Sequence, residues 1–187
     1  LCEVAAQFGF SPILVSFNPY RTVYQPDPPL NDYEIRQLQG DPEEQTANIH
    51  MVTYGPDLNI SVADLPVEHL IDIGRKLTYY SPYIVPFSYS SPFYKGELWQ
   101  GLSVRTFIRT GKRPATLVFV EKQEQLIKSV PSLTKIARIP AEVGRIEFKA
   151  FDSCADFSIY ASLLTLLKGL ILDESLMGRA TTPAVAL

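Results

Sequence analysis

The sequence has few cysteines, few histidines and no long uninterrupted apolar segment. Cys2 and Cys154 are its only cysteines, too few for a disulfide framework and without the C-x-x-C spacing of a zinc or redox pair. The longest apolar run, residues 157–172, is interrupted by Lys168 and is shorter than the ~20 residues that span a bilayer. We therefore expect a reduced, cytoplasmic protein with no membrane contact, in which this run forms a buried helix.

Several functional signatures are also missing. The sequence contains neither a Walker-type phosphate loop nor a G-x-G-x-x-G turn, so neither common nucleotide fingerprint applies. It has no G-x-S-x-G elbow and no Ser-His-Asp order, so a serine hydrolase is unsupported. Its formal net charge of −3 gives no electrostatic reason to expect nucleic acid as a partner.

Proline, by contrast, is abundant, with 15 residues in a chain of 187. Because proline lacks an N–H and disfavours helix in the residue before it, residues 18–45 are predicted to be a long proline-rich loop with at most one helical turn. Connections of this length are often functional. The length of the chain suits a single domain over residues 1–187, or the C-terminal part of a larger domain.

The order of the expected elements indicates the fold class. Apolar periodicity and turn residues predict helices over residues 1–10, from 61 or 64 to 82, and over 156–177. They predict strands over residues 12–17, 46–54, 102–108 and 144–150, while residues 115–120 suit either a strand or the start of a helix. Because strands and helices mix without strict alternation, we expect an antiparallel α+β fold.

The segment "GRIEFKAFDSC" is the most informative of these strands. Side chains alternate between the two faces of a strand, so Arg145, Glu147 and Lys149 share one face and the apolar residues share the other. A carboxylate between two cations could hold Mg²⁺ and neutralise a phosphoryl group. An ordinary solvated sheet face would have the same residues, and the strand alone favours that interpretation.

Other candidate residues are equally open when taken one at a time. His50 lies on a predicted strand, where a neutral imidazole could bind a metal or a nucleotide or could simply be structural. Ser103 and Arg105 share one face of the predicted strand 102–108. A guanidinium there suits a phosphate or a carboxylate, although a surface ion pair explains it as well.

Taken in order, these segments resemble a known family. "NIHMVTYGPD", a helix, "PFSYSSPFYKGELWQGLSVRT" and "GRIEFKAFDSCADFSIYASLLTLLKGLI" follow one another over roughly residues 46–175. They resemble the later half of the glutamate-cysteine ligase and carboxylate-amine ligase family. In that family an H-x-H strand, an N-S-P-F-x-x-G segment, an S-x-R strand and an E-x-R-x-x-D strand before a long apolar helix occur in the same succession.

The resemblance implies a fold and a reaction. The expected fold is a curved, mainly antiparallel sheet that forms a funnel of glutamine-synthetase-like architecture, with helices on its outer face. The expected activity is that of an ATP- and Mg²⁺-dependent ligase in glutathione biosynthesis. Such an enzyme activates a carboxylate, commonly that of glutamate, as an acyl phosphate and joins it to cysteine or another amine.

The resemblance also implies roles for individual residues. Glu147 would be a Mg²⁺ ligand, and Lys149 would contact phosphate where the family usually has arginine. Arg105 would contact phosphate or a substrate carboxylate, with Ser103 beside the nucleotide on the same motif. His50 would occupy the second histidine position of the H-x-H strand, near nucleotide or metal.

The sequence departs from the family pattern in ways that leave a second hypothesis open. Asn48 stands for the first histidine, Ser90 for the usual asparagine, and Lys149 for arginine. Nothing before residue 46 matches the G-x-E-x-E strand that supplies most of the family's metal ligands. The alternative is therefore a non-catalytic relative that acts as a binding or partner domain. A missing N-terminal segment, a second chain with the missing half, or a homo-oligomer would also fit.

Overall fold

The computed structural model describes residues 1–21, 26–40, 53–109, 113–129 and 131–181, without the side chains of residues 37–40. The described helices are α1 (Cys2–Gln7), α2 (Asp32–Gly40), α4 (Val67–Ile84), α5 (Val104–Arg109) and α6 (Ser158–Leu172). Three short 3-10 helices are η2 (Val85–Ser88), η3 (Gln123–Gln125) and η4 (Pro140–Glu142). The strands are β1 (Leu58–Ser61), β2 (Phe93–Tyr94), β3 (Glu97–Leu98), β4 (Thr116–Val120), β5 (Thr134–Ile136) and β6 (Arg145–Phe148).

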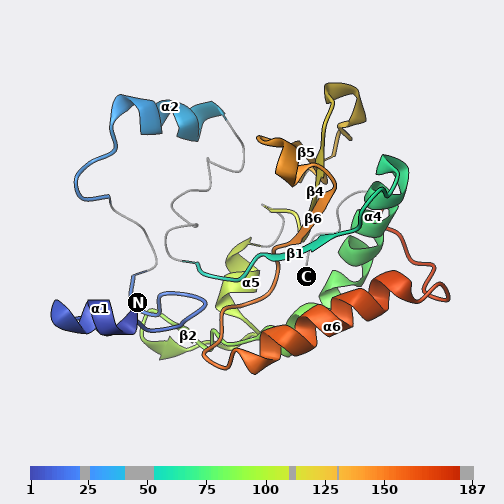
Figure 1. Ribbon diagram of the computed structural model, residues 1–187. Coiled ribbons are helices and arrows are strands. Elements are labelled where there is room, and N and C mark those ends of the chain that lie inside the picture. The colour runs from blue at the N-terminus through green and yellow to red at the C-terminus, as the bar shows by residue number, and fades with distance from the viewer. Residues whose placement is uncertain (22–25, 41–52, 110–112, 130, 182–187) are drawn as a thin grey trace.

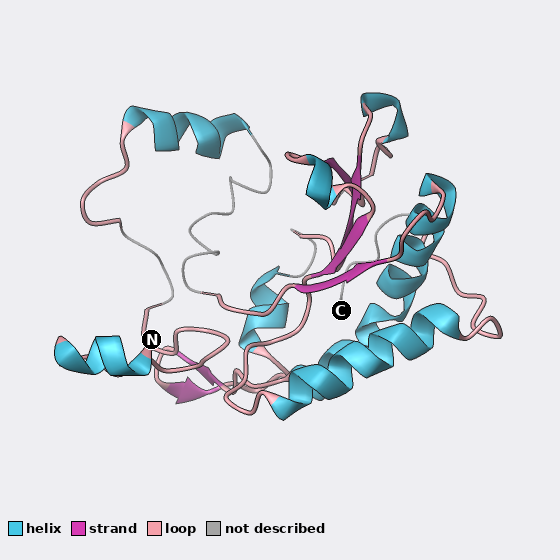
Figure 2. Cartoon of the chain, viewed as in Figure 1, coloured by secondary structure: helices cyan, strands magenta, loops and turns pink. Residues whose placement is uncertain are grey.

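A mixed four-stranded sheet organises the chain, in the order β1-β6-β4-β5 (Figure 2). The central strand β6 pairs antiparallel with β1 and β4, whereas β5 runs parallel to β4. Strands β2 and β3 form a separate hairpin. The α+β class is thus confirmed. The predicted funnel is not seen in the part of the chain described, because the four strands form an open sheet that does not curl.

Helix α4 packs against β4 and β6 on one face of this sheet, and α6 packs against α4 (Figure 1). Their apolar residues meet the side chains of Ile146 and Phe148, of which at most 1% is exposed. Leu77 of α4 and Leu167 of α6 are fully buried in the same core. Burying each side chain of this size contributes about 1.5–3 kcal/mol, so the core fixes which face of β6 is left for charged residues.

Helix α6 ends earlier than its apolar pattern predicts. It stops at Leu172 rather than near Met177, and the buried Lys76 of α4 donates to the carbonyl of Asp173 at 2.6 Å. An ammonium group at this position satisfies carbonyls that have no partner within the helix and complements the negative end of its dipole. A cation from another helix therefore fixes the C-terminus of α6.

Helix α4 continues past the residue at which it was predicted to end. Pro82 lies inside the helix, which runs on to Ile84. A proline has no N–H for the carbonyl four residues earlier, here that of Thr78. The hydroxyl of Ser81 donates to that carbonyl at 2.8 Å, so the missing bond is replaced by a side chain.

Two other predictions for the first half need correction. The predicted loop 18–45 contains the nine-residue helix α2, and the predicted strand 12–17 is reduced to an isolated bridge between Phe17 and Thr53. The start of α2 is a capping box, since the Asn31 side chain accepts from the Glu34 N–H and the Glu34 carboxylate accepts from the Asn31 N–H. Most of the predicted strand 46–54 lies outside the described residues.

The segment 102–108, predicted as a strand, also forms a helix. The hydroxyl of Ser103 accepts from the N–H of Thr106 at 3.4 Å, so Ser103 acts as the N-cap of α5. Arg105 and Arg109, four residues apart, consequently share one side of this helix. None of the described helices is long and apolar enough to span a membrane.

Candidate functional site

The predicted row of charges on β6 exists and is more enclosed than a solvated sheet face. Arg145, Glu147 and Lys149 lie on the face opposite the apolar core. Glu147 is 5% exposed, and its carboxylate accepts a hydrogen bond from Arg145 at 2.7 Å and forms an ion pair with Lys149 at 3.1 Å. The guanidinium of Arg145 also stacks 3.9 Å from the centre of the Phe119 ring. The row is therefore a partly buried ion-pair chain.

The two cations of this row have different freedom. Arg145 also donates to Asn59 of β1 at 2.9 Å and pairs with Glu142 at 3.1 Å, so neighbouring residues hold its guanidinium in place. The salt bridge of Lys149 with Glu147 engages one of the three donors of an ammonium group. Lys149 is thus the member of the row better suited to contact a ligand.

Asp152, just after β6, joins three segments that are distant in the sequence. Its carboxylate accepts from the hydroxyl of Ser103 at 2.6 Å and from the N–H of Ser90 at 3.0 Å. Its other oxygen lies 3.6 Å from the guanidinium of Arg105. Asp152 is fully buried, and the donors to Oδ2 replace water at that oxygen. Oδ1 has no hydrogen-bond partner among the described residues and is compensated by the charge of Arg105. The S-S-P-F, S-x-R and E-x-K-x-x-D segments therefore meet at one carboxylate.

Two arginines of α5 reach from this point to the end of β6. Arg105 donates to the carbonyls of Ala150 at 3.0 Å and Lys149 at 3.2 Å. Arg109 donates to the carbonyl of Lys149 at 2.6 Å. Both side chains are more than nine-tenths buried. These bonds place two guanidinium groups beside the backbone of Lys149.

Burial disfavours the positive charges of Arg105 and Arg109. It lowers the pKa of Arg109 well below the ordinary value, and the neighbouring charges of Arg105 and Arg113 lower it further. Burial also lowers the pKa of Arg105, although Asp152 opposes that shift. Arginine keeps its charge in proteins, so these shifts show how strongly the surroundings disfavour a cation without a matching anion. An anionic ligand would relieve that cost at Arg109.

Asp57, just before β1, lies beside the same cluster. Loss of water around the carboxyl group raises its pKa, and the nearby charge of Glu147 adds to this rise. The cations Lys149, Arg109 and Arg105 act in the opposite direction. A carboxyl group with a raised pKa among cations is a candidate proton acceptor. No pattern in the sequence indicates this role for Asp57.

The raised pKa of Asp57 predicts how stability depends on pH. In the unfolded chain this carboxyl titrates near 3.8, whereas in the folded protein it holds its proton to higher pH. Its favourable contribution is therefore complete below pH 3.8 and is lost as pH rises through the folded pKa. We expect Asp57→Asn to be more stable than the wild type at pH 7, by under about 1 kcal/mol because the side chain remains accessible.

Denaturant unfolding of both proteins across this pH range measures that difference. The stability gain of the Asn variant should grow as pH rises from about 3.5 to 7 and then level off. A pH-independent difference would contradict the raised pKa.

The described residues do not by themselves form a Mg²⁺ site. Both carboxylate oxygens of Glu147 are engaged by cations. No group of three or more His, Cys, Asp or Glu side chains suited to a metal lies within the described ranges. Mg²⁺ requires near-octahedral oxygen ligation. The predicted role of Glu147 as a metal ligand would need further ligands from nucleotide phosphates and from residues outside those ranges.

The structure brings most of the predicted site residues together. Ser103, at the N-terminus of α5, and Arg105, within it, both contact Asp152. Arg105 also donates to the carbonyl of Lys149, whose side chain pairs with Glu147. His50 lies outside the described residues. Sequence reasoning missed Arg109, whose position one helical turn after Arg105 would have been a signal had the segment been predicted as helical.

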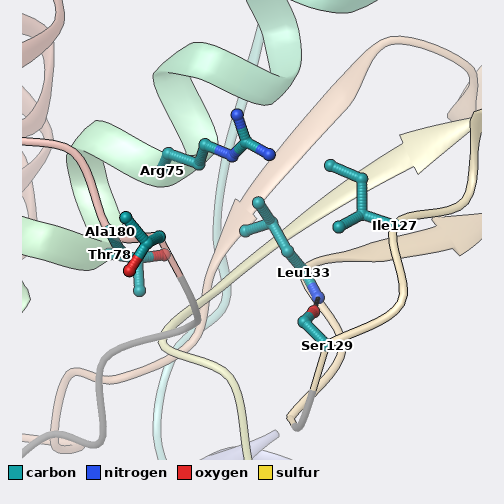
Figure 3. A pocket seen from close by; sticks show the side chains of 7 residues that line it. Arg75, Thr78, Ile127, Ser129, Leu133 and Ala180 are labelled. Atoms are coloured by element: carbon teal, nitrogen blue, oxygen red, sulfur yellow. Dashed lines mark hydrogen bonds between the residues drawn. The ribbon is translucent and has the colours of Figure 1, made fainter.

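Two pockets away from the arginine cluster do not suit an anionic ligand. The cavity between α4, the segment 127–133 and Ala180 measures about 10 Å³, barely the space for one water (Figure 3). Leu133 points into it, and the N–H of Leu133 is bound to the hydroxyl of Ser129. A larger pocket near the start of β6, about 480 Å³, has acidic residues Asp64 and Glu121 in its lining.

Comparisons with known proteins add no family to these observations. No family model matches the sequence, and a search of curated proteins found no match. The resemblance to carboxylate-amine ligases therefore rests on the order of the motifs in the sequence.

Proposed function

We propose that the chain is part of an ATP-dependent carboxylate-amine ligase of glutamate-cysteine ligase type. The observation that carries this proposal is the cluster of Arg105, Arg109 and Lys149 at the end of β6, beside the carboxyl groups of Asp57 and Glu147. Phosphoryl transfer depends chiefly on positioned cations that neutralise the moving phosphoryl group. The cluster supplies such cations, and the motif order indicates the reaction.

In the proposed reaction a carboxylate oxygen of the acid attacks the γ-phosphorus of ATP. The bond to the bridging oxygen breaks, ADP leaves, and an acyl phosphate forms. The amine nitrogen then attacks the acyl carbon, the C–O bond to phosphate breaks, and an amide forms. Arg109 and Lys149 would bind the phosphoryl oxygens, while Asp57 would take the proton that the amine loses. Mg²⁺ would accompany the nucleotide.

Arg105 has a supporting part in this proposal. Its guanidinium is already engaged by the Asp152 carboxylate and by the carbonyls of Ala150 and Lys149. These contacts fix the backbone of Lys149 and leave little of Arg105 for substrate. We therefore assign Arg105 to positioning. The glutamine-synthetase-like funnel belongs to the same proposal and would need strands beyond the four described ones.

The second candidate function is a non-catalytic binding or partner domain. It is favoured by the engagement of both Glu147 oxygens and by the incomplete metal site in the described residues. The two functions make different demands on the same cluster. A ligase needs turnover of ATP, whereas a partner domain needs only a binding surface.

The deciding experiment measures ADP release with ATP, Mg²⁺ and a panel of amino acids, on the full-length product of the gene. A ligase should release ADP and form an amide in equal amounts, with glutamate and cysteine tested first. ADP release without amide would indicate a different ATPase activity. No ADP release across the panel would overturn the ligase proposal and favour the partner domain.

A further inference from the structure

A pocket of about 430 Å³ lies on the far side of α5 from the arginine cluster. Phe107 lies two residues from both Arg105 and Arg109, which places it about 200° away around the helix axis. The pocket is therefore separate from the proposed phosphate site. Its lining consists of Tyr89, Trp99, Gly101, Leu102, Ser103, Thr106 and Phe107.

Three aromatic residues, Tyr89, Trp99 and Phe107, contribute to the pocket wall. The rings of Trp99 and Phe107 lie 5.1 Å apart at 45°, and Phe107 is 64% exposed, so the wall is accessible from solution. Gly101 permits the indole edge to lie close to the backbone, because a Cβ there would overlap the Trp99 nitrogen. A hollow of this volume is large enough for a small organic molecule.

The lining of the pocket is uncharged, since none of the residues that form it has a charged side chain. Behind the lining, the buried carboxylate of Asp152 accepts from the hydroxyl of Ser103 and lies 3.6 Å from the guanidinium of Arg105, so its charge is paired. Aromatic ring faces carry negative potential and therefore attract cations. The rings are thus the feature of this pocket that favours a positive charge.

In the neighbouring β2–β3 hairpin, a cation of the protein lies over an aromatic ring. The ammonium group of Lys95 lies 5.4 Å from the centre of the Tyr94 ring, and that ring contacts Trp99 edge-on at 5.7 Å. Several rings around a hollow recognise alkylated ammonium groups in proteins. The residues that line the pocket include no lysine or arginine that could occupy its ring faces in this way.

We propose that this aromatic pocket binds a small organic cation, an alkylated ammonium group held against the faces of Trp99 and Phe107. The ring faces would attract the charge, while the hydrocarbon substituents would fill the apolar hollow. The site does not depend on the ligase reaction, because its ligand would contact the opposite side of α5.

Trp99 makes the proposal directly testable, since it is the single tryptophan of the sequence and lines the pocket. Choline is titrated while tryptophan fluorescence is followed, and equilibrium dialysis of choline gives a readout independent of the fluorophore. The uncharged isostere 3,3-dimethylbutan-1-ol is titrated in parallel. Choline should bind saturably and about tenfold more tightly than the isostere, as expected for cation–π contacts with two rings.

Two exposed phenylalanines provide matched variants. Phe107→Leu should weaken choline binding about fivefold and leave binding of the isostere nearly unchanged, because it removes a ring but keeps an apolar side chain. Phe157→Leu, at a position 67% exposed and outside the pocket lining, should change neither. Equal affinity for choline and the isostere, an unchanged choline affinity in Phe107→Leu, or no saturable binding by either readout would overturn the proposal.

Discussion

Replacement of Asp152 by alanine is expected to lower the free energy of unfolding by about 3–5 kcal/mol. The side chain is fully buried, and its removal would leave the charge of Arg105, 3.6 Å away, without a carboxylate. The hydroxyl of Ser103 and the N–H of Ser90 would also lose their acceptor. Each buried donor left without a partner adds about 1–3 kcal/mol before relaxation, so several penalties arise at once.

An exposed pair of the same residue types provides the control for this prediction. Asp72 accepts from Arg179 at 2.7 Å, a shorter contact than that of Asp152 with Arg105, but its side chain is 50% exposed. Asp72→Ala should therefore cost under about 1 kcal/mol. Urea unfolding of both variants, followed by circular dichroism, measures the two losses. Similar losses would show that burial of Asp152 does not determine its contribution.

The isosteric variant Asp152→Asn separates charge from shape. Ser103 and Ser90 donate to the same oxygen of Asp152, so the amide oxygen of an asparagine can accept from both, but the negative charge beside Arg105 is removed. We expect it to lose less stability than the alanine variant and still more than Asp72→Ala. An asparagine variant as stable as the wild type would mean that the charge of Asp152 contributes nothing to the pairing.

The charged strand was predictable because its pattern is local. Alternation with period two separates Arg145, Glu147 and Lys149 from the apolar residues of β6, and a central strand packed against two helices must follow that alternation. The sequence could not show how deeply Glu147 is buried. Its burial depends on the neighbouring strands, because the sheet places Glu147 between Asn59 of β1 and Leu117 of β4.

The helix α5 was predicted as a strand because its residues are ambiguous. Val104, Thr106 and Ile108 favour strands by propensity. The N-cap contact of Ser103 and the bonds of Arg105 and Arg109 to the end of β6 favour the helix instead. Those bonds connect residues about 40–45 positions apart, so tertiary contacts overrode the local preference.

The helix boundaries illustrate which signals were present in the sequence. The Asn-x-x-Glu pattern that begins α2 is a local signature and could have predicted the helix inside the proline-rich segment. The passage of α4 through Pro82 depends on a serine one position earlier that satisfies the freed carbonyl. The end of α6 depends on Lys76 from another helix, which no local pattern reveals.

Replacement of Arg109 by methionine is expected to separate stability from ligand binding. Removing the side chain loses the hydrogen bond to the carbonyl of Lys149, but also removes a cation that burial and the neighbouring Arg105 and Arg113 disfavour. Replacement of buried charge by an apolar side chain of similar volume is often neutral or stabilising. We therefore expect the free energy of unfolding to stay equal or rise, by up to about 2 kcal/mol.

The same change should weaken the binding of anions. If Arg109 contacts phosphoryl oxygens as proposed, the loss of its charge-assisted bonds removes about 1.5–3 kcal/mol, a 10- to 100-fold weaker affinity for ATP. Calorimetric titration with ATP measures this loss. Arg109→Lys keeps the charge but loses the planar fork, so it should lie between methionine and wild type.

The exposed Arg138 supplies the matched control, because Arg138→Met removes the same charge from the protein surface. That variant should leave both stability and ATP affinity nearly unchanged. A residue whose charge is costly in the unliganded protein and valuable to its ligand is the pattern expected of a binding site. A loss of more than about 2 kcal/mol of stability in Arg109→Met would instead assign Arg109 to the structural support of β6. An unchanged affinity for ATP would remove Arg109 from the phosphate site.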